Sequence, residues 1–470
     1  MVKKLLKSIG FLACLIAVLL GLNSVFKLKY GDGIYSVEKF YEQDKDSVDV
    51  LILGSSHAFE NINTGVLWDE YGMSSYIMGG SLQNMWNTYF YLREALKTQT
   101  PKVIVLEGYG LVLPEEDVFD STIIKNTFGL KWSRNKVDAI KASVPRERWA
   151  EFFLSYVQYH NRYKELAKED FLPDQGYNYY ENWKGFVCNM ETVSFERPDV
   201  SGLTKRGLIP EKTENYYRMV LELAKAEGIP VMVVIAPYAG ITDDEQEKYL
   251  TAAMVAAEYD VPFLNCNTLY DEIGIDFDSD IGDRDHLNLR GNVKFTKFLG
   301  SYLKGSFDIP DHRGDMAYGS WEKNADYIRQ MIYDKELSEL TRREEITAKL
   351  SNKNLEVFVS ADGDCSAYDA STAELLNELG ISFNGQNGIW YLKDGATIWS
   401  SENVTDEYYW STKRNDFLLK RAGVHNGIFI DNRQYRLTEN GINIVVFDTL
   451  TGEIADCMAF NSYDGYNAVR

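Results

Sequence analysis

The chain has 470 residues, enough for two or three domains, and its hydrophobic and charged fractions of 45% and 25% are those of an ordinary globular protein. A net charge of −21 argues against nucleic acid as a partner, because a polyanion is bound through clustered lysine and arginine. The five cysteines form no CxxC pair and no metal-ligand spacing, so no metal or cofactor is predicted. Cys365 and Cys457 could pair or remain free thiols.

The N-terminus carries an uncharged apolar run, SIGFLACLIAVLLGLNSVF at residues 8–26, which is long enough to span a bilayer as a helix. Lys3, Lys4 and Lys7 precede it and favour a cytoplasmic start, which leaves the long remainder of the chain outside the cytoplasmic membrane. A signal peptide has the same opening, but no small-x-small cleavage site follows the run cleanly. Residues 1–26 are therefore predicted as a cytoplasmic tip and one uncleaved transmembrane anchor.

After the anchor, predicted strands and helices alternate. Helical spacing at 81–98, 211–227 and 243–259 separates apolar runs that read as strands, which are residues 48–54, 102–110, 228–238 and 261–267. Strands separated by helices indicate a parallel sheet that is covered on both faces. We therefore predict an α/β three-layer domain over residues 27–310, interrupted at 111–210 by an insert rich in aromatic residues and helix formers.

The alternation stops near residue 305. Pro310 and the polar residues after it predict a linker, and a charged helix over about 320–350 predicts a spacer within residues 311–353. Residues 354–470 are dominated by short apolar runs and Gly or Asn turns, which indicates a separate, small, β-rich domain.

Two polar clusters lie where a parallel sheet places its sites, at the carboxyl ends of strands. GSSH, residues 54–57, follows the first predicted strand, and Asp283 and His286 stand in Asp-x-x-His spacing before the last helix of the α/β domain. A serine nucleophile needs a base, and the base needs an acid to hold its tautomer. Ser56, His286 and Asp283 can supply these three roles. The alternative for GSSH is a polar turn without chemistry, and His57 is a competing base that we interpret as structural.

These two motifs together resemble the SGNH (GDSL-type) hydrolase superfamily, whose first block is Gly-Asp-Ser and whose last block is Asp-x-x-His. The resemblance covers roughly residues 45–305 and implies a flavodoxin-like parallel sheet with Ser56 as the nucleophile. It also implies an oxyanion hole built from the N–H groups of Ser56 and of Gly79, the latter within YIMGGSLQN. Ser55 stands where the family usually has aspartate.

One family block is missing. Where the family has Gly-x-Asn-Asp, this chain has Glu107-Gly108-Tyr109, without the asparagine that adds an oxyanion donor. That departure is closer to the DltD-like and alginate-acetylation-like membrane-anchored branch, which acts in acyl transfer to surface polymers, than to soluble esterases. Glu107, Tyr109 and His160 are candidate substrate contacts, each with packing as its alternative.

The C-terminal segment resembles the interleukin-like EMT inducer (ILEI, PANDER-like) domain over about residues 354–465, through a Val-rich strand, a helix ending in Leu-Gly, and Gly441-Ile-Asn-Ile before Asp448 and Gly452. This resemblance implies a sandwich-like, non-catalytic binding domain, and a folding or spacing module is the alternative. Three aromatic residues are candidates for a sugar platform or for core, namely Trp390, Tyr391 and Trp399.

The expected function is a membrane-anchored, extracytoplasmic serine O-acyltransferase that passes an acetyl or D-alanyl type group to a cell-surface polysaccharide or polymer. A multi-pass membrane O-acyltransferase of the MBOAT type is the donor partner that the resemblance implies. An esterase with the same triad and a non-catalytic glycan-binding scaffold are the alternatives.

Overall fold

A computed structural model describes residues 2–26, 32–115, 119–153, 159–166, 168–171, 183–363, 370–383, 385–401, 405–412, 414–423, 425–461 and 467–470. The chain divides into two compact units, Met1–Asp326 and Tyr327–Arg470. Cys365 lies outside the described residues, and so does its possible pairing with Cys457.

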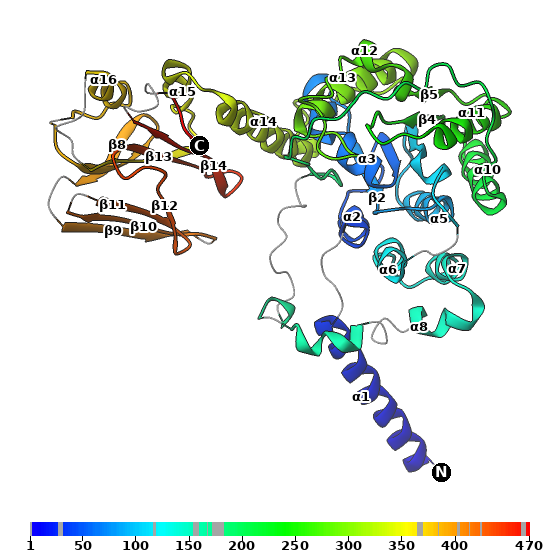
Figure 1. Ribbon diagram of the computed structural model, residues 1–470. Coiled ribbons are helices and arrows are strands. Elements are labelled where there is room, and N and C mark those ends of the chain that lie inside the picture. Colours follow the sequence, from blue (N-terminus) through cyan, green and yellow to red (C-terminus); the bar gives the residue numbers. More distant parts are fainter. Residues whose placement is uncertain are drawn as a thin grey trace. The chain divides into compact units, whose positions relative to one another are not determined.

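Unit 1 is built on a five-stranded parallel sheet in the order β2-β1-β3-β4-β5 (Figure 1). The predicted α/β class is thereby confirmed, and the strand order is the flavodoxin-like one. The strand β2, Ser75–Gly79, was not predicted from the sequence. The strands are β1 Val50–Gly54, β2 Ser75–Gly79, β3 Val103–Glu107, β4 Val231–Ile235 and β5 Phe263–Asn265.

Helices connect these strands and cover the sheet. The α-helices of unit 1 are α1 Val2–Phe26, α2 Asp32–Phe40, α3 Ser56–Asn61, α4 Thr64–Tyr71, α5 Met85–Ala95, α6 Asp120–Thr127, α7 Arg134–Ser143, α8 Trp149–Phe153, α10 Glu211–Ala226, α11 Asp243–Ala257, α12 Tyr270–Ile273 and α13 Leu289–Ser306. Short 3-10 helices are η1 Gly108–Leu111, η2 Arg146–Arg148, η3 His160–Lys164, η4 Lys168–Phe171, η5 Cys266–Thr268 and η6 Met316–Tyr318.

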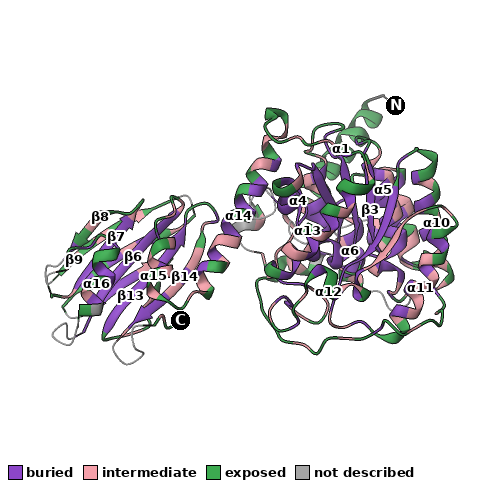
Figure 2. Ribbon diagram, turned by 90° about the horizontal axis from the view of Figure 1, so that it is seen from above, coloured by how far each residue is buried: buried purple, intermediate pink, exposed green. Residues whose placement is uncertain are grey.

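Both faces of the sheet are buried. Successive residues of a strand point to opposite faces. Leu51 and Leu53 join the main hydrophobic cluster together with residues of α5 and α10, while Val50 and Ile52, on the other face, are equally inaccessible. Because neither face of the sheet meets water, the sequences of these strands are nearly continuous apolar runs. The strands β1 to β4 are buried throughout and the edge strand β5 is intermediate, while the outer side of α10 is largely exposed (Figure 2).

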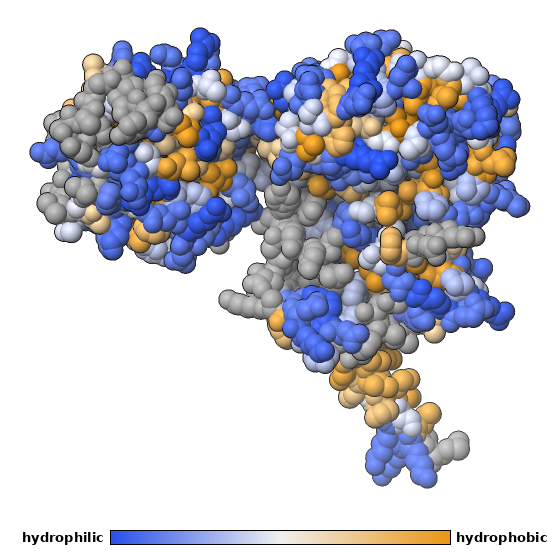
Figure 3. All heavy atoms as spheres, viewed as in Figure 1, coloured by the Kyte–Doolittle hydropathy of each residue, from blue (hydrophilic) through white to orange (hydrophobic). Residues whose placement is uncertain are grey.

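The α1 helix is long and apolar enough to cross a membrane over Lys3–Phe26, and none of its most apolar window is buried by the rest of the chain. Figure 3 shows it as a hydrophobic column with a hydrophilic N-terminal tip. This helix fits a single-pass membrane anchor or a signal sequence.

The insert at 111–210 has two parts. Its helices α6 and α7 pack against α2, α5 and each other. The later part, from Phe186 to about Val200, is irregular and is tied to the sheet domain by backbone hydrogen bonds, such as Val187 N–H to Phe59 O at 2.7 Å and Leu289 N–H to Asn189 O at 3.0 Å. The insert therefore reaches the segments that carry the predicted site.

Unit 2 contains two antiparallel sheets in the described residues, ordered β14-β13-β6-β7-β8 and β12-β11-β10-β9, which confirms the predicted β-rich architecture. Its elements are α15 Arg343–Lys349, β6 Leu355–Asp362, α16 Ala370–Glu378, β7 Gly388–Lys393, β8 Ala396–Ser401, β9 Thr405–Ser411, β10 Asp416–Ala422, β11 His425–Ile430, β12 Arg433–Tyr435, β13 Gly441–Asp448 and β14 Glu453–Phe460.

The three aromatic candidates for a sugar platform do not lie on one face, because Tyr391 and Trp399 pack in one hydrophobic cluster and Trp390 in another. Trp390 and Tyr391 are buried on opposite faces of β7, in two different hydrophobic clusters. Trp399 is half-buried and stacks on Tyr408 with ring centroids 5.2 Å apart. The core alternative therefore holds for Trp390 and Tyr391.

The predicted spacer helix is wrong as a spacer. It consists of α14 Gly319–Glu339 followed by α15, and both helices contribute to hydrophobic cores. Trp321 and Ala325 belong to the core of unit 1, whereas Leu337 and Ile346 are buried in the core of unit 2. The abundance of charge along this segment hid its apolar residues, although several of them, such as Trp321, Ile328 and Leu337, are buried.

Candidate active site

Ser56 stands at the end of β1, where the strand turns into α3. The turn is tight: a Cβ on Gly54 would lie 2.8 Å from Glu107 Cβ and 2.9 Å from Ala58 Cβ, so a larger residue would clash. Ser55 is the N-cap of α3, and its hydroxyl accepts a hydrogen bond from His57 N–H at 3.3 Å. Ser56 is thereby the first residue of α3, at the carboxyl edge of the sheet. That edge, between β1 and β3, is where the strand order of such sheets switches direction and where their ligands bind.

His286 and Asp283 form the pair that the Asp-x-x-His spacing predicts. The His286 Nδ1 atom lies 2.9 Å from Asp283 Oδ1 and 3.0 Å from Oδ2. Asp283 Oδ1 also accepts the backbone N–H groups of Asp285 at 2.8 Å and His286 at 3.0 Å, which fixes the carboxylate under the ring. On the other side of the ring, His286 Nε2 is buried and has no hydrogen-bond partner among the described residues. It is the nitrogen that a general base would offer.

The electrostatics of the pair favour an ion pair at low pH. Burial disfavours the charged form of His286, but its hydrogen bond to Asp283 and the negative charges of Glu60, Asp283 and Asp285 raise its pKa above the usual value. Burial likewise opposes ionisation of Asp283, but the hydrogen bond and charge of His286 lower the pKa of this carboxyl below its usual value. The two shifts are opposite in direction and both favour the charged form, as the mutual stabilisation of an ion pair requires.

Two residues of this cluster were not predicted. Glu60 lies one helical turn after Ser56 on α3, and its Oε2 is 3.7 Å from His286 Nδ1. Burial raises the pKa of Glu60 to about 7, against the favourable charge of His286. Asn189, from the irregular part of the insert, donates through Nδ2 to Asp283 Oδ2 at 3.1 Å. No motif marks either residue in the sequence. One ligand atom each from Glu60, Asp283 and His286 lie within 4.8 Å of one another, so the three have a spacing that a metal ion could accept.

A third unpredicted residue, Asn61, joins the serine helix to the histidine loop. Its Oδ1 accepts the backbone N–H of Leu287, the residue after His286, at 2.8 Å, and the side chain is fully buried. Asn63 extends the connection through Nδ2 to Asn292 Oδ1 at 3.1 Å. Residues separated by more than 220 positions in sequence are thus held together by buried amides, which are costly to leave unpaired.

His57 forms part of the wall of the site. Its ring stacks on Tyr109 at 3.7 Å between centroids and meets Tyr238 edge-on at 4.7 Å. It also lies 5.3 Å from the ring of His286, so its side chain faces the site. Neither ring nitrogen of His57 has a partner in the described part of the chain, and burial lowers the pKa of the ring well below its usual value. A neutral His57 without a carboxylate fits packing better than base chemistry.

Glu107 and Gly79 lie at the same sheet edge as Ser56. Glu107 is buried beneath the turn, and burial raises its pKa to about 8 although backbone N–H groups, that of Tyr109 first among them, favour its charged form. Gly79 pairs with Gly54 across β1 and β2, and a Cβ on it would lie 2.8 Å from Gly54 O. His160 lies in η3, and its side chain is outside the described residues. The oxyanion role of Gly79 and the substrate role of Glu107, Tyr109 and His160 stay predictions.

Comparisons with known proteins give the following. No protein-family profile matches the sequence, and no curated protein matches it. Among solved structures, one from Bacteroides fragilis described as an acylhydrolase matches with 11% identity and a TM-score of 0.28, covering 60% of this chain and 99% of its own. A GDSL-like lipase from Bacteroides thetaiotaomicron matches with 12% identity and a TM-score of 0.25, covering 55% of this chain and 88% of its own.

Proposed function

We propose that the protein is a serine-dependent acyl-transfer enzyme of the SGNH type, anchored to the membrane by α1, which acylates a glycan or polymer outside the cell. Ser56 Oγ would attack the acyl donor while His286 Nε2 removes its proton, and Asp283 would stabilise the imidazolium. His286 would give this proton to the departing group of the donor, which leaves Ser56 acylated. It would then take the proton of an acceptor hydroxyl and pass it to Ser56 Oγ as the acyl group moves to the acceptor oxygen. The backbone N–H groups of Ser56 and Gly79 would hold the oxyanion.

The observation that carries this proposal is the asymmetry of His286. Its Nδ1 is held by a carboxylate at 2.9 Å, and its Nε2 is buried without a partner at the sheet edge where Ser56 begins α3. His57, at the same site, has no partner for either ring nitrogen among the described residues and has no carboxylate, so the contact of Asp283 with Nδ1 is what distinguishes His286. A general base of this kind has one nitrogen held by an acid and leaves the other for the proton that it accepts.

An activity-based probe tests the nucleophile. A fluorophosphonate should label the purified full chain, and Ser56→Ala should abolish the labelling. Ser55→Ala is the matched control, because it removes the neighbouring hydroxyl and should leave labelling in place. Equal labelling of Ser56→Ala and the unmodified chain would show that another residue reacts and contradicts the proposal, whereas no labelling of the unmodified chain favours the glycan-binding scaffold.

Transfer and hydrolysis use the same triad and differ in the acceptor. With an activated acetyl ester as donor, rising concentrations of an oligosaccharide should convert released acetate into acetylated sugar, which mass spectrometry separates. Release of acetate alone at every sugar concentration would identify an esterase. The proposed partners are a cell-surface polysaccharide or polymer as acceptor and an MBOAT-type membrane protein as donor. Unit 2 is proposed to bind glycan.

A further inference from the structure

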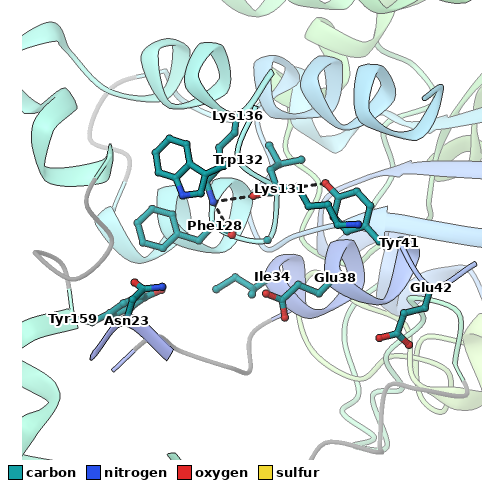
Figure 4. A pocket seen from close by; sticks show the side chains of 12 residues that line it. Asn23, Ile34, Glu38, Tyr41, Glu42, Phe128, Lys131, Trp132, Lys136 and Tyr159 are labelled. Atoms are coloured by element: carbon teal, nitrogen blue, oxygen red, sulfur yellow. Dashed lines mark hydrogen bonds between the residues drawn. The ribbon is translucent and has the colours of Figure 1, made fainter. Parts of the chain in front are cut away.

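A cavity of about 450 Å³ lies in unit 1 beside the end of α1, away from Ser56 and His286 (Figure 4). Its volume falls in the range of small-molecule sites. Its walls come from the last turn of α1, from α2 and from the segment between α6 and α7. The lining residues are Asn23, Ile34, Glu38, Tyr41, Glu42, Phe128, Gly129, Leu130, Lys131, Trp132, Lys136 and Tyr159.

The cavity lies at the depth of lipid headgroups if α1 spans a membrane. The uncharged run at residues 8–26 is about 28 Å long as a helix, close to the roughly 30 Å hydrocarbon core, and Lys7 precedes it. The last turn of α1 therefore falls at the boundary between the hydrocarbon core and the headgroup layer. That turn is fixed to the domain, because Phe26 packs against the cluster that contains Phe152 and Arg162 Nη1 donates to Phe26 O at 2.5 Å. Asn23, from this turn, lines the cavity.

The side chains in the cavity suit a phospholipid. Tyr41, Phe128 and Trp132 supply aromatic faces of the kind enriched at membrane interfaces, and Trp132 is 62% exposed. Lys131 makes no ion pair within the described residues, and its Nζ lies 4.0 Å from the ring centroid of Tyr41. Lys136 is already occupied, because its Nζ donates to the Phe128 and Leu130 carbonyls, both at 2.9 Å.

The two cavity lysines thus differ in availability, and Lys131 is the cation that a phosphate would reach. Glu38 and Glu42 place carboxylates on the same cavity, which disfavours a headgroup of purely negative charge. Glu42 is also paired with Lys39 Nζ at 3.1 Å, so it remains on the cavity as half of an ion pair. A zwitterionic headgroup matches this distribution of charge, with its phosphate toward Lys131 and its ammonium on the side of the cavity where the carboxylates lie.

We propose that this cavity binds the glycerophosphate and headgroup of an amine-bearing phospholipid of the surrounding bilayer, held by Lys131 and the aromatic walls. The inference rests on the uncleaved anchor of the proposed function but not on its acyl chemistry. A lipid seated there would fix the height and tilt of the catalytic domain above the membrane, where a membrane-embedded donor would deliver the acyl group.

Native mass spectrometry of the full chain tests the proposal. The protein is delipidated in detergent, phosphatidylethanolamine is added back, and the fraction of protein retaining lipid is measured. Lys131→Glu should lower this fraction at least about fivefold, because it reverses the charge that meets the phosphate. Lys141→Glu is the matched control: Lys141 is exposed on α7, outside the cavity, with its Nζ 4.8 Å from the Trp149 ring centroid, and lipid retention should be unchanged.

Lys131→Gln, which removes the charge and keeps most of the side chain, should lower retention in the same direction and guards against misfolding of Lys131→Glu. Unchanged retention in Lys131→Gln, with the fold verified by circular dichroism, overturns the proposal. Displacement of the lipid by equimolar phosphoethanolamine also overturns it, in favour of a site for a soluble ligand. The intact mass in the same spectra shows whether residues 1–26 are present, and labelling of Ser56 is measured separately. Failure of the anchor or of the acyl chemistry is therefore distinguishable from failure of the lipid site.

Discussion

The imidazole rings of His57 and His286 lie 5.3 Å apart at 63°, yet only His286 has a carboxylate partner. His57 is instead enclosed by Tyr109 and Tyr238 and is held neutral by burial. The two histidines of one site thus have opposite electrostatic surroundings. This difference assigns the role of base to His286 and a packing role to His57.

The same substitution at both histidines tests this separation. His286→Phe should lower the rate of acyl-ester turnover about 10³-fold or more, because the base is lost. His57→Phe should keep the rate within about threefold and the free energy of unfolding within about 1 kcal/mol, since it keeps a ring against Tyr109 and removes two buried nitrogens without partners. Turnover of an activated ester and thermal unfolding measure both. A large rate loss in a folded His57→Phe would assign His57 to the chemistry.

The pH profile should report the carboxylates around His286. A base works only when neutral, so activity falls below the raised pKa of His286. Above its own pKa of about 7, Glu60 carries a negative charge 3.7 Å from Nδ1. Glu60→Gln removes this charge and should move the acid limb of the profile to lower pH while changing the maximal rate by less than about threefold. Asp283→Asn should move the limb in the same direction and also lower the maximal rate about 10²–10⁴-fold, because the tautomer is no longer held.

The contrast between these two variants is the decisive result. An acid limb that stays in place in Glu60→Gln would show that this carboxylate does not act on His286. Glu245→Gln is the control, because Glu245 is a carboxylate of the capping box of α11 and is not a partner of the His286 ring.

The sequence predicted those parts of the protein that depend on local patterns. β1, β3 and β4 are unbroken apolar runs, and Asp283 and His286 are three residues apart, so their pairing is encoded within one loop. The position of Ser56 at the site could be predicted because it directly follows a strand, and sites of parallel sheets lie at the carboxyl ends of strands.

Contacts between distant segments could not be predicted in this way. Glu60, Asn61 and Asn189 meet the histidine loop only after the chain has folded, and none belongs to a motif. The role of α14 was missed for a related reason: Trp321 and Leu337 serve two different cores, so a single amphipathic stripe does not form along the helix.

The boundary of unit 2 leads to a prediction about truncation. A fragment of residues 327–470 should unfold cooperatively, because it contains its own core and exceeds the size at which domains fold alone. A fragment of residues 354–470 lacks Leu337, Ile346 and Leu350, which are buried in that core, and should lose several kcal/mol, on the order of 5 or more. Leu337→Ala in the longer fragment should lie between them, about 2–5 kcal/mol below the parent. Urea unfolding followed by circular dichroism measures all three. Equal stability of the two fragments would show that the helices are dispensable.

A buried carboxyl pair should make unit 2 less stable as pH rises. Burial and the neighbouring charge of Asp448 raise the pKa of Asp334 above its usual value, and Gln330 Nε2 donates to Asp334 Oδ1 at 2.9 Å. A carboxyl whose folded pKa is raised stabilises the fold below its unfolded pKa of about 4 and loses that contribution as pH rises through the folded value.

The free energy of unfolding of the 327–470 fragment should therefore fall between about pH 4 and pH 8, by about 1 kcal/mol or more, at roughly 1.4 kcal/mol for each pKa unit. Asp334→Asn should abolish much of this fall and stabilise the fragment at pH 8, because an amide can accept from Gln330 and donate to Asp448 without a proton from solvent. Asp394→Asn, at an exposed turn, is the control and should leave the pH dependence unchanged. Urea titrations across this pH range measure each variant. The amide of Asn does not titrate in this pH range, so the variant lacks the protonation of Asp334. If Asp334→Asn is nevertheless as pH-sensitive as the parent, the carboxyl pair is not the source of the effect.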